Sequence, residues 1–415
     1  MSNKTINYLA ILFYLSLLAG FFLNEDLNGG AKPDFYSYDK LINSFVYNFQ
    51  DTLLNYESFN ERHSPLMVII ISLFSKANFD FDIIRFINLH INLLSIYFFY
   101  QCLKIKFSDV NLNYLILISL IFFLSTTFRS LSIWPDSRGI GLLFIIISIK
   151  YFLEYQESKK FDYVLKNIFF LAISSYFSPN FSLFSIYFFF YYLLNIRNFK
   201  NILYIVIFNI ILAFPAFYYV YILDVNFIQL GATPGSSKVL ISESVEFNIS
   251  NKIISITSII FFYVFPVFIY TKNVYQKKIL TISLSIIFFI IYTVCILNFN
   301  YQVSFTGGGI FFLISNYVFQ NNYLLYFICL IAFYFFFIKN FNLNNLFIIS
   351  ILIFSNPQLS IYHKYYDPLI LVLMFTLFQF NIHKDFFNKL NVSLMYFIYL
   401  FFLIAKSFKI FLNLL

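Results

Sequence analysis

The stretch INYLAILFYLSLLAGFFL, residues 6–23, decides the fold of this chain. It is an unbroken apolar run that, as a helix, is long enough to cross about 30 Å of hydrocarbon. Lys4 stands just before it, it has no small-residue cleavage site, and many similar runs follow. We therefore predict that it is a first transmembrane helix and not a removed signal peptide.

The rest of the chain has the same character. Of its 415 residues, 60% are hydrophobic and only 11% are charged, whereas a soluble chain carries about 25% charged residues. This composition excludes a soluble enzyme, a disulfide-stapled secreted domain and a disordered chain. We predict one all-α polytopic membrane domain, residues 1–415, with an outer loop at 24–82 and the remaining bundle at 83–415. About 11–13 transmembrane helices are expected, the later ones at 83–102, 111–128, 138–153, 163–177, 180–195, 202–222, 253–270, 279–297, 323–338, 345–355, 368–381 and 391–411.

The lysines and arginines predict the orientation of these helices. With the N-terminus in the cytoplasm, every inner connection carries at least one positive charge, as the positive-inside rule requires. The net charge of +8 is therefore an effect of topology, and because it forms no basic stripe we expect no nucleic-acid partner. The localisation predicted is a multi-pass protein of a bacterial inner (plasma) membrane.

The acidic residues have the opposite distribution. Only five of the 19 fall on the inner side, and the others lie outside or at the outer ends of helices. Acidic residues do not set topology, so this asymmetry has another cause, and we expect the active site on the outer face. The five inner residues are Asp109, Glu154, Glu157, Asp162 and Asp385.

The first outer connection, residues 24–64, is the longest polar segment. Asp34 stands where a helix N-cap is expected, after Gly30 and Pro33. Apolar residues then recur at helical spacing and predict an amphipathic helix on the membrane surface. These are Tyr38, Leu41, Ile42, Phe45 and Phe49.

Carboxylates in this connection are candidates for a catalytic base. Partial desolvation raises the pKa of a carboxylate towards the working range of a general base. Asp34 is the first candidate because a helix start would hold it in place, and Glu25 and Asp26 are its rivals. The alternative is that Asp34 only caps its helix while Glu25 and Asp26 are solvated.

The sequence ERHSP, residues 61–65, ends the connection. Pro65 suits the first turn of a short apolar helix, expected at 65–74, that is too short to span a membrane. Arg62 and His63 could bind a phosphate or orient the catalytic carboxylate. Alternatively, Arg62 pairs with a nearby acid or a lipid headgroup.

A second outer turn holds Arg129, Trp134, Asp136 and Arg138. Two arginines around one aspartate indicate an anion site, and lipid anchoring is the alternative, with Trp134 as a membrane-interface residue.

In a late outer loop, His363 and Lys364 are candidates for binding a phosphate or diphosphate. The alternative is that Lys364 only extends its charged end to the membrane interface.

Cofactor motifs are absent from the sequence. It contains no HExxH, no phosphate-binding loop, no GxSxG and no Cys/His metal spacing, so no metal site is predicted. A divalent cation stays open as a cofactor because His63 and His363 could both reach the outer face near carboxylates.

This layout resembles the GT-C superfamily of integral-membrane glycosyltransferases, which includes protein O-mannosyltransferases and aminoarabinose transferases. The resemblance lies in one helix, a long acidic outer loop with surface helices, and a short helix opened by His63, Ser64, Pro65 and Leu66. A span carrying Arg85 and Phe86 follows. Ser64 departs from the family pattern, which has a proline there, and the later half of the chain is similar only in hydropathy.

The resemblance implies a glycosyltransferase that uses a polyprenyl-phosphate-linked sugar and acts on the non-cytoplasmic face. The acceptor would be a hydroxyl of a glycan, lipid or protein, and an acidic residue would activate it. Membrane lipids would surround the enzyme. Basic residues would stabilise the leaving phosphate.

Two other functions fit the sequence. One is a transporter or flippase of a lipid-linked or small solute, and the other is an O-antigen polymerase-like enzyme. The absence of a cavity beneath the first outer connection would favour the transporter.

Overall fold

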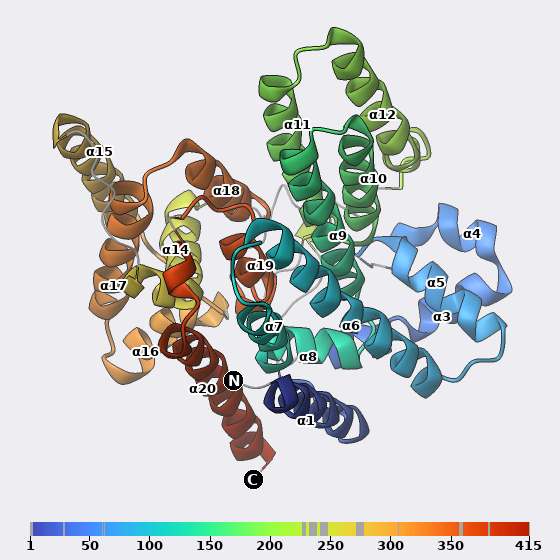
Figure 1. Ribbon diagram of the computed structural model, residues 1–415. Coiled ribbons are helices and arrows are strands. Elements are labelled where there is room, and N and C mark those ends of the chain that lie inside the picture. The colour runs from blue at the N-terminus through green and yellow to red at the C-terminus, as the bar shows by residue number, and fades with distance from the viewer. Residues whose placement is uncertain are drawn as a thin grey trace. The chain divides into compact units, whose positions relative to one another are not determined.

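The computed structural model describes residues 3–27, 30–59, 61, 63–225, 230–231, 239–240, 248–270, 278–305, 307–356, 360–380 and 382–414. These residues fall into two compact units, Met1–Leu230 with Tyr396–Leu415, and Gly231–Met395. Each unit is built mainly of helices (Figure 1). One pair of two-residue strands, β1 (Leu230–Gly231) and β2 (Val239–Leu240), is also present.

The first unit contains the N-terminal half of the chain. Within it, α9 packs against α6 and α10, α1 packs against α7 and α8, and α5 contacts α3, α6 and α10. The elements of this unit are α1 (Asn3–Phe22), α2 (Ala31–Ser37), α3 (Asp39–Tyr47), α4 (Phe49–Leu54), η1 (Tyr56–Phe59), α5 (Pro65–Lys76), α6 (Phe81–Lys106), α7 (Leu112–Leu120), η2 (Ile121–Leu124), α8 (Thr126–Ile133), α9 (Ser137–Ser158), α10 (Phe161–Phe177), η3 (Pro179–Leu183), α11 (Phe184–Asn195), α12 (Phe199–Phe217), η4 (Tyr218–Ile222) and most of α20 (Lys389–Leu414).

The second unit is arranged around one helix. Helix α14 contacts α15, α16, α17, α18 and α19. The elements are α14 (Ile249–Tyr270), α15 (Lys278–Leu297), η6 (Val303–Phe305), α16 (Ile310–Val318), α17 (Tyr323–Phe333), η7 (Tyr334–Lys339), α18 (Leu343–Phe354), η8 (His363–Tyr365), α19 (Leu369–Phe375), η9 (Lys384–Phe386) and the start of α20.

Within the described part of the chain, six helices are long and apolar enough to cross a membrane. A seventh candidate is the pair Leu112–Leu124 and Thr126–Ile133, which is bent by 67°. The chain is therefore a helical, multi-pass membrane protein. The six are Asn3–Phe22, Phe81–Lys106, Ser137–Ser158, Phe199–Ile222, Ile249–Tyr270 and Lys389–Phe408.

Several expected spans are short or broken in the structure, and two of them show the reason. The run 111–128 is not one straight helix, because the Ser125 side chain accepts a hydrogen bond from the Phe128 amide and so caps a new helix. The run 368–381 contains only the seven-residue α19. All residues of α19 are buried, as expected for a helix that is apolar on every side and lies in a protein core. Fewer than the expected 11–13 runs therefore form full-length spanning helices in the described part of the chain.

The described residues of 24–64, a segment predicted from the sequence to be the first outer connection and called by that name below, form a small packed core. Its predicted amphipathic helix is divided between α2, α3 and α4, with Asn48 capping α4 through the Asp51 amide. Leu41, Ile42 and Phe45 on α3 are buried, and α3 packs against α5. The expectation that this apolar face lies on the membrane is therefore wrong for these residues, because protein covers them.

Replacing Phe45 with Ala tests this packing. Removing a buried phenylalanine costs about 3–5 kcal/mol of stability, so F45A should increase amide hydrogen exchange in residues 31–76 of the protein in detergent. The matched control is F49A, because Phe49 is 46% exposed on the same stripe. Equal exchange in the two variants would contradict burial of the α3 face against α5.

Candidate functional site

The end of α1 determines where the first outer connection begins. Asn24 adopts a left-handed conformation with φ 56°, and the amides of Asn24 and Glu25 donate to the carbonyls of Phe21 and Gly20 over 3.1 and 2.8 Å. This is the hydrogen-bond pattern of a Schellman helix end. It folds Glu25 back over the last turn of α1.

Glu25 forms a bidentate ion pair with Arg129 of α8. Two guanidinium nitrogens each lie 2.6 Å from one of its carboxylate oxygens. Arg129 also donates to the hydroxyl and carbonyl of Ser16 and to the carbonyl of Phe123. Five hydrogen bonds thus match the five N–H donors of a guanidinium.

Gly20 is required for this close approach. A Cβ atom at position 20 would lie 2.5 Å from a Glu25 carboxylate oxygen and 3.0 Å from an Arg129 nitrogen. A larger residue at position 20 would therefore displace the ion pair from the surface of α1.

Arg85 holds the same region from α6. Its guanidinium stacks over Trp134, 3.7 Å from the ring centroid, and donates to the carbonyls of Ile133 and Phe21. The Trp134 ring nitrogen in turn donates to the Glu25 carbonyl over 2.9 Å. Trp134 is fully buried, so it is a packing residue and not the interfacial anchor considered above.

Asp26 caps the next helix. One of its carboxylate oxygens accepts hydrogen bonds from the amides of Gly30 and Lys32 at the N-terminus of α2. Asp34, expected at the N-cap, lies instead within the first turn of α2. The expected capping role therefore belongs to Asp26.

Asp34 faces the start of α9. A carboxylate oxygen of Asp34 lies 3.8 Å from a guanidinium nitrogen of Arg138, and the Asp34 side chain is 31% exposed. Asp136 is fully buried and binds Arg138 through both carboxylate oxygens, at 3.0 and 2.6 Å. Asp136 also caps α9 through the Arg138 amide.

The charge state of Asp136 follows from these contacts. Burial opposes ionisation, but the charge and hydrogen bonds of Arg138, helped by the charge of His63, hold the pKa of the Asp136 carboxyl well below its usual range. Asp136 is therefore an anion that fixes Arg138.

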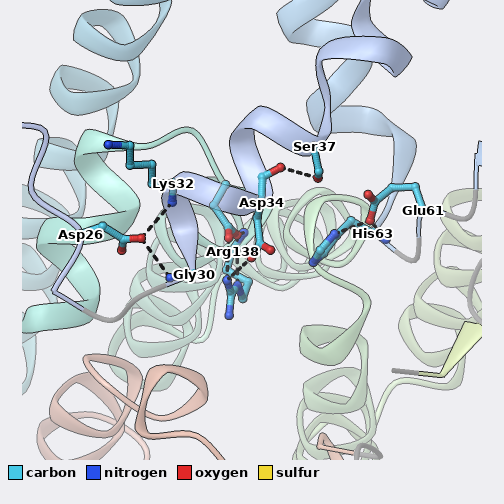
Figure 2. Close-up of polar contacts among 9 residues, drawn as sticks. Asp26, Gly30, Lys32, Asp34, Ser37, Glu61, His63 and Arg138 are labelled. Atoms are coloured by element: carbon cyan, nitrogen blue, oxygen red, sulfur yellow. Dashed lines mark hydrogen bonds and ion pairs between the residues drawn. The ribbon is translucent and has the colours of Figure 1, made fainter. Parts of the chain in front are cut away.

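His63 completes this group of residues. Its Nδ1 atom lies 2.5 Å from a Glu61 carboxylate oxygen, which also accepts from the His63 amide. The imidazole meets the Tyr38 ring edge to face at 6.0 Å. Figure 2 shows the imidazole extending towards Arg138 and Asp34. We call Asp34, Tyr38, Glu61, His63, Asp136 and Arg138 the polar cluster.

Tyr38 is buried at the centre of the polar cluster. Burial first, and then the charges of Asp136, Glu61 and Asp34, raise the pKa of its phenol. The hydroxyl is thus a permanent donor, and within the described residues it has no hydrogen-bond partner.

The other predicted site residues lie elsewhere. Arg62 is outside the described residues. His363 and Lys364 belong to the second unit, where His363 accepts a hydrogen bond from the Ile310 amide at Nε2 and contacts the Tyr263 hydroxyl through Nδ1. The expected meeting of His363 and Lys364 with the first outer connection stays a prediction.

A groove of about 520 Å³ adjoins the polar cluster. Its walls come from α4, α5, η3 and α10–α12, with η4, and are largely apolar. Ser64, Pro65 and Leu66 line it directly after His63. The Ser64 hydroxyl donates to the Tyr176 carbonyl, and the Tyr176 hydroxyl donates to the Leu212 carbonyl of α12 over 2.6 Å.

No group of three His, Cys, Asp or Glu side chains suited to a metal ion occurs among the residues that the structure describes. The divalent cation considered from the sequence stays a prediction.

Two members of the polar cluster, Tyr38 and Glu61, were missed as site residues in the sequence. Tyr38 was placed on the apolar stripe, although it follows Asp34 at the four-residue spacing that places side chains on one helix face. Glu61 was considered only as a partner of Arg62, although it stands two residues before His63.

No family model, no curated protein and no solved structure matches this chain. The polar cluster and the groove beside it therefore carry the functional argument.

The Glu25–Arg129 pair should be essential for the fold. Glu25→Gln leaves a buried guanidinium without its counter-charge, which costs about 3–5 kcal/mol, and should lower the Tm of the purified protein markedly. The control is Asp82→Asn, because Asp82 pairs with Arg85 but is 79% exposed, and an exposed pair contributes about 1 kcal/mol or less. A Tm of E25Q equal to that of D82N would contradict the role assigned to the pair.

Proposed function

We propose that this chain is a membrane glycosyltransferase. It transfers a sugar from a polyprenyl-phosphate carrier to a hydroxyl of a glycan, lipid or protein on the non-cytoplasmic face. The proposed architecture is a GT-C-like bundle in a bacterial inner membrane, with the N-terminus in the cytoplasm.

The observation that carries this proposal is an apolar groove whose lining includes Ser64, the residue directly after His63 of the polar cluster. The groove volume and its apolar walls suit part of a long hydrocarbon chain. The cluster begins where the groove lining reaches Ser64, one residue after His63. A polyprenyl-phosphate sugar has the same division, with an apolar tail joined directly to an anionic head.

Asp34 is the best base among the three candidate carboxylates. Glu25 is occupied on both oxygens by Arg129, and one Asp26 oxygen holds two helix amides. The Asp34 side chain is partly exposed, and its one ion pair among the described residues is the 3.8 Å contact with Arg138. It can therefore accept a proton from an acceptor hydroxyl.

The reaction is a direct displacement at the anomeric carbon. Asp34 takes the acceptor proton, the acceptor oxygen bonds to the anomeric carbon, and the bond from that carbon to the phosphate oxygen breaks with its electron pair on the phosphate. Arg138, fixed by Asp136, stabilises the charge that develops on the phosphate.

The position of the groove supports a transferase. The absence of a cavity at the first outer connection would have favoured a transporter, and Leu53 and Ser64 of that connection line the groove. This placement favours a site that processes an amphipathic substrate at the outer end of the helices.

Asp34→Asn tests the base. Loss of a general base lowers the rate by about 10²–10⁴-fold, so transfer from polyprenyl-phosphate glucose, mannose or galactose should fall by that factor in D34N. The control is Asp39→Asn, since Asp39 is an exposed acid in the first turn of α3. Full transfer by D34N would show that the base is another residue, with D26N and E25Q as the next variants to assay. No transfer by the wild-type protein would overturn the proposed function.

Filling the groove tests the binding of the lipid tail. Ala213→Trp places a large side chain on the groove wall and should raise KM for a long-chain donor by roughly tenfold, the equivalent of about 1.4 kcal/mol of lost apolar contact. A donor with a short prenyl chain should be affected less. Ile210→Trp is the control, because Ile210 is 61% exposed on the same helix and is not part of the lining. Equal KM values in the two variants would contradict tail binding in this groove.

A further inference from the structure

The Glu61–His63 pair has well-defined contacts but no role in the displacement assigned to Asp34 and Arg138. Glu61 binds both the amide and the Nδ1 atom of His63 through one oxygen. The Tyr56 hydroxyl donates to the His63 carbonyl over 2.9 Å. These three contacts fix the backbone and the ring of His63 together.

The orientation of the imidazole follows from this arrangement. With Nδ1 directed at Glu61, the opposite nitrogen, Nε2, points away from Glu61. In Figure 2 the ring extends from the Glu61 side towards Arg138 and Asp34. Side-chain exposure of 20% for His63 and 14% for Glu61 keeps the pair partly desolvated.

The polar cluster carries an excess of acidic side chains. Three carboxylates, on Glu61, Asp34 and Asp136, accompany one guanidinium, on Arg138, within it. The charge of His63 contributes to the low pKa of the Asp136 carboxyl. Among the described residues, the titratable or charged groups that contact His63 or couple to it electrostatically are Glu61 on its own segment, Tyr38 before α3, Tyr56 on η1 and Asp136 before α9. The ring extends towards Asp34 on α2 and Arg138 on α9.

We propose that His63 is the general acid that protonates the departing phosphate, and that Glu61 is the positioning residue that holds its imidazole for this task. The inference rests on the proposed function, and it gives His63 a chemical step in place of simple phosphate binding.

Each proton and each bonding electron pair in this step has a defined destination. As the bond between the anomeric carbon and the phosphate oxygen breaks, the proton on His63 Nε2 moves to a phosphate oxygen, and polyprenyl phosphate leaves as a monoanion. His63 becomes neutral and keeps the proton on Nδ1, which donates a hydrogen bond to Glu61. The acceptor proton on Asp34 then returns to His63 through solvent, so one proton passes from acceptor to phosphate in each turnover.

The chemistry of the leaving group explains the need for an acid. The second ionisation of a phosphate monoester occurs near pH 6. Near neutral pH, the departing group is therefore present both as a monoanion and as a dianion. A proton donor that titrates in the same range can share the developing charge, and imidazole is the side chain with that property.

The test is the pH dependence of kcat/KM for the full-length protein in detergent, with polyprenyl-phosphate glucose, mannose and galactose as donors. The wild-type rate should fall on the alkaline side as the acid loses its proton. In Glu61→Gln this limb should move to lower pH, because a nearby carboxylate stabilises the protonated form of an imidazole. In His63→Gln the limb should disappear and kcat should fall by about 10²–10⁴-fold.

The chain provides a matched control for Glu61→Gln. His383 and Asp385 have the same two-residue spacing and a 3.1 Å contact, but both are about two-thirds exposed. Asp385→Asn should leave the alkaline limb where it is in the wild type. If the alkaline limb of the pH profile is unchanged in both E61Q and H63Q while the wild type transfers normally, the general-acid role is overturned and the proposed function stands. No transfer by the wild type with any donor would overturn both.

A second measurement separates loss of the pair from misfolding. The rate at which diethyl pyrocarbonate modifies each histidine can be followed by mass spectrometry, with His383 as an internal reference. Because only neutral imidazole reacts, His63 should be modified faster in E61Q than in the wild type at the same pH, with the His383 rate unchanged. Equal His63 rates would overturn the coupling to Glu61.

Discussion

The buried guanidinium of Arg129 is the interaction on which the first unit depends. A buried cation is tolerated only when every donor is paired, and Arg129 meets this condition with Glu25, Ser16 and Phe123. These partners come from α1, the segment after α1 and the segment before α8. The cation therefore fixes where the first outer connection begins, and hence where Asp34 can lie.

This constraint divides the acidic residues by role. Glu25 neutralises Arg129, Asp26 satisfies the free amides of α2, and Asp136 fixes Arg138. Glu25 and Asp136 have both carboxylate oxygens bound to an arginine, and one oxygen of Asp26 is bound to two amides. Asp34 is more exposed than Glu25 and Asp136, and the Nε2 atom of His63 is directed away from the Glu61 contact, so both can reach a ligand.

Local signals in the sequence predicted part of this structure correctly. The apolar run at residues 6–23 forms the long helix α1, and Pro65 lies in the first turn of α5, as expected. The bend at Ser125 and the burial of α19 were not predictable, because hydropathy does not distinguish lipid from a protein core. The site itself depends on pairs more than 70 residues apart in sequence, such as Asp34 with Arg138, for which no local pattern exists.

Helix α5 explains why the apolar and polar halves of the site meet. Its first residues line the groove, the residue before its N-cap is His63, and its buried side packs under α3. The Ser64 side chain both caps α5 and binds the Tyr176 carbonyl, so the groove wall and the cluster share one anchoring point. A displacement of α5 would therefore move the groove and the polar cluster together, which would keep their spacing constant for the proposed substrate, whose head and tail are covalently joined.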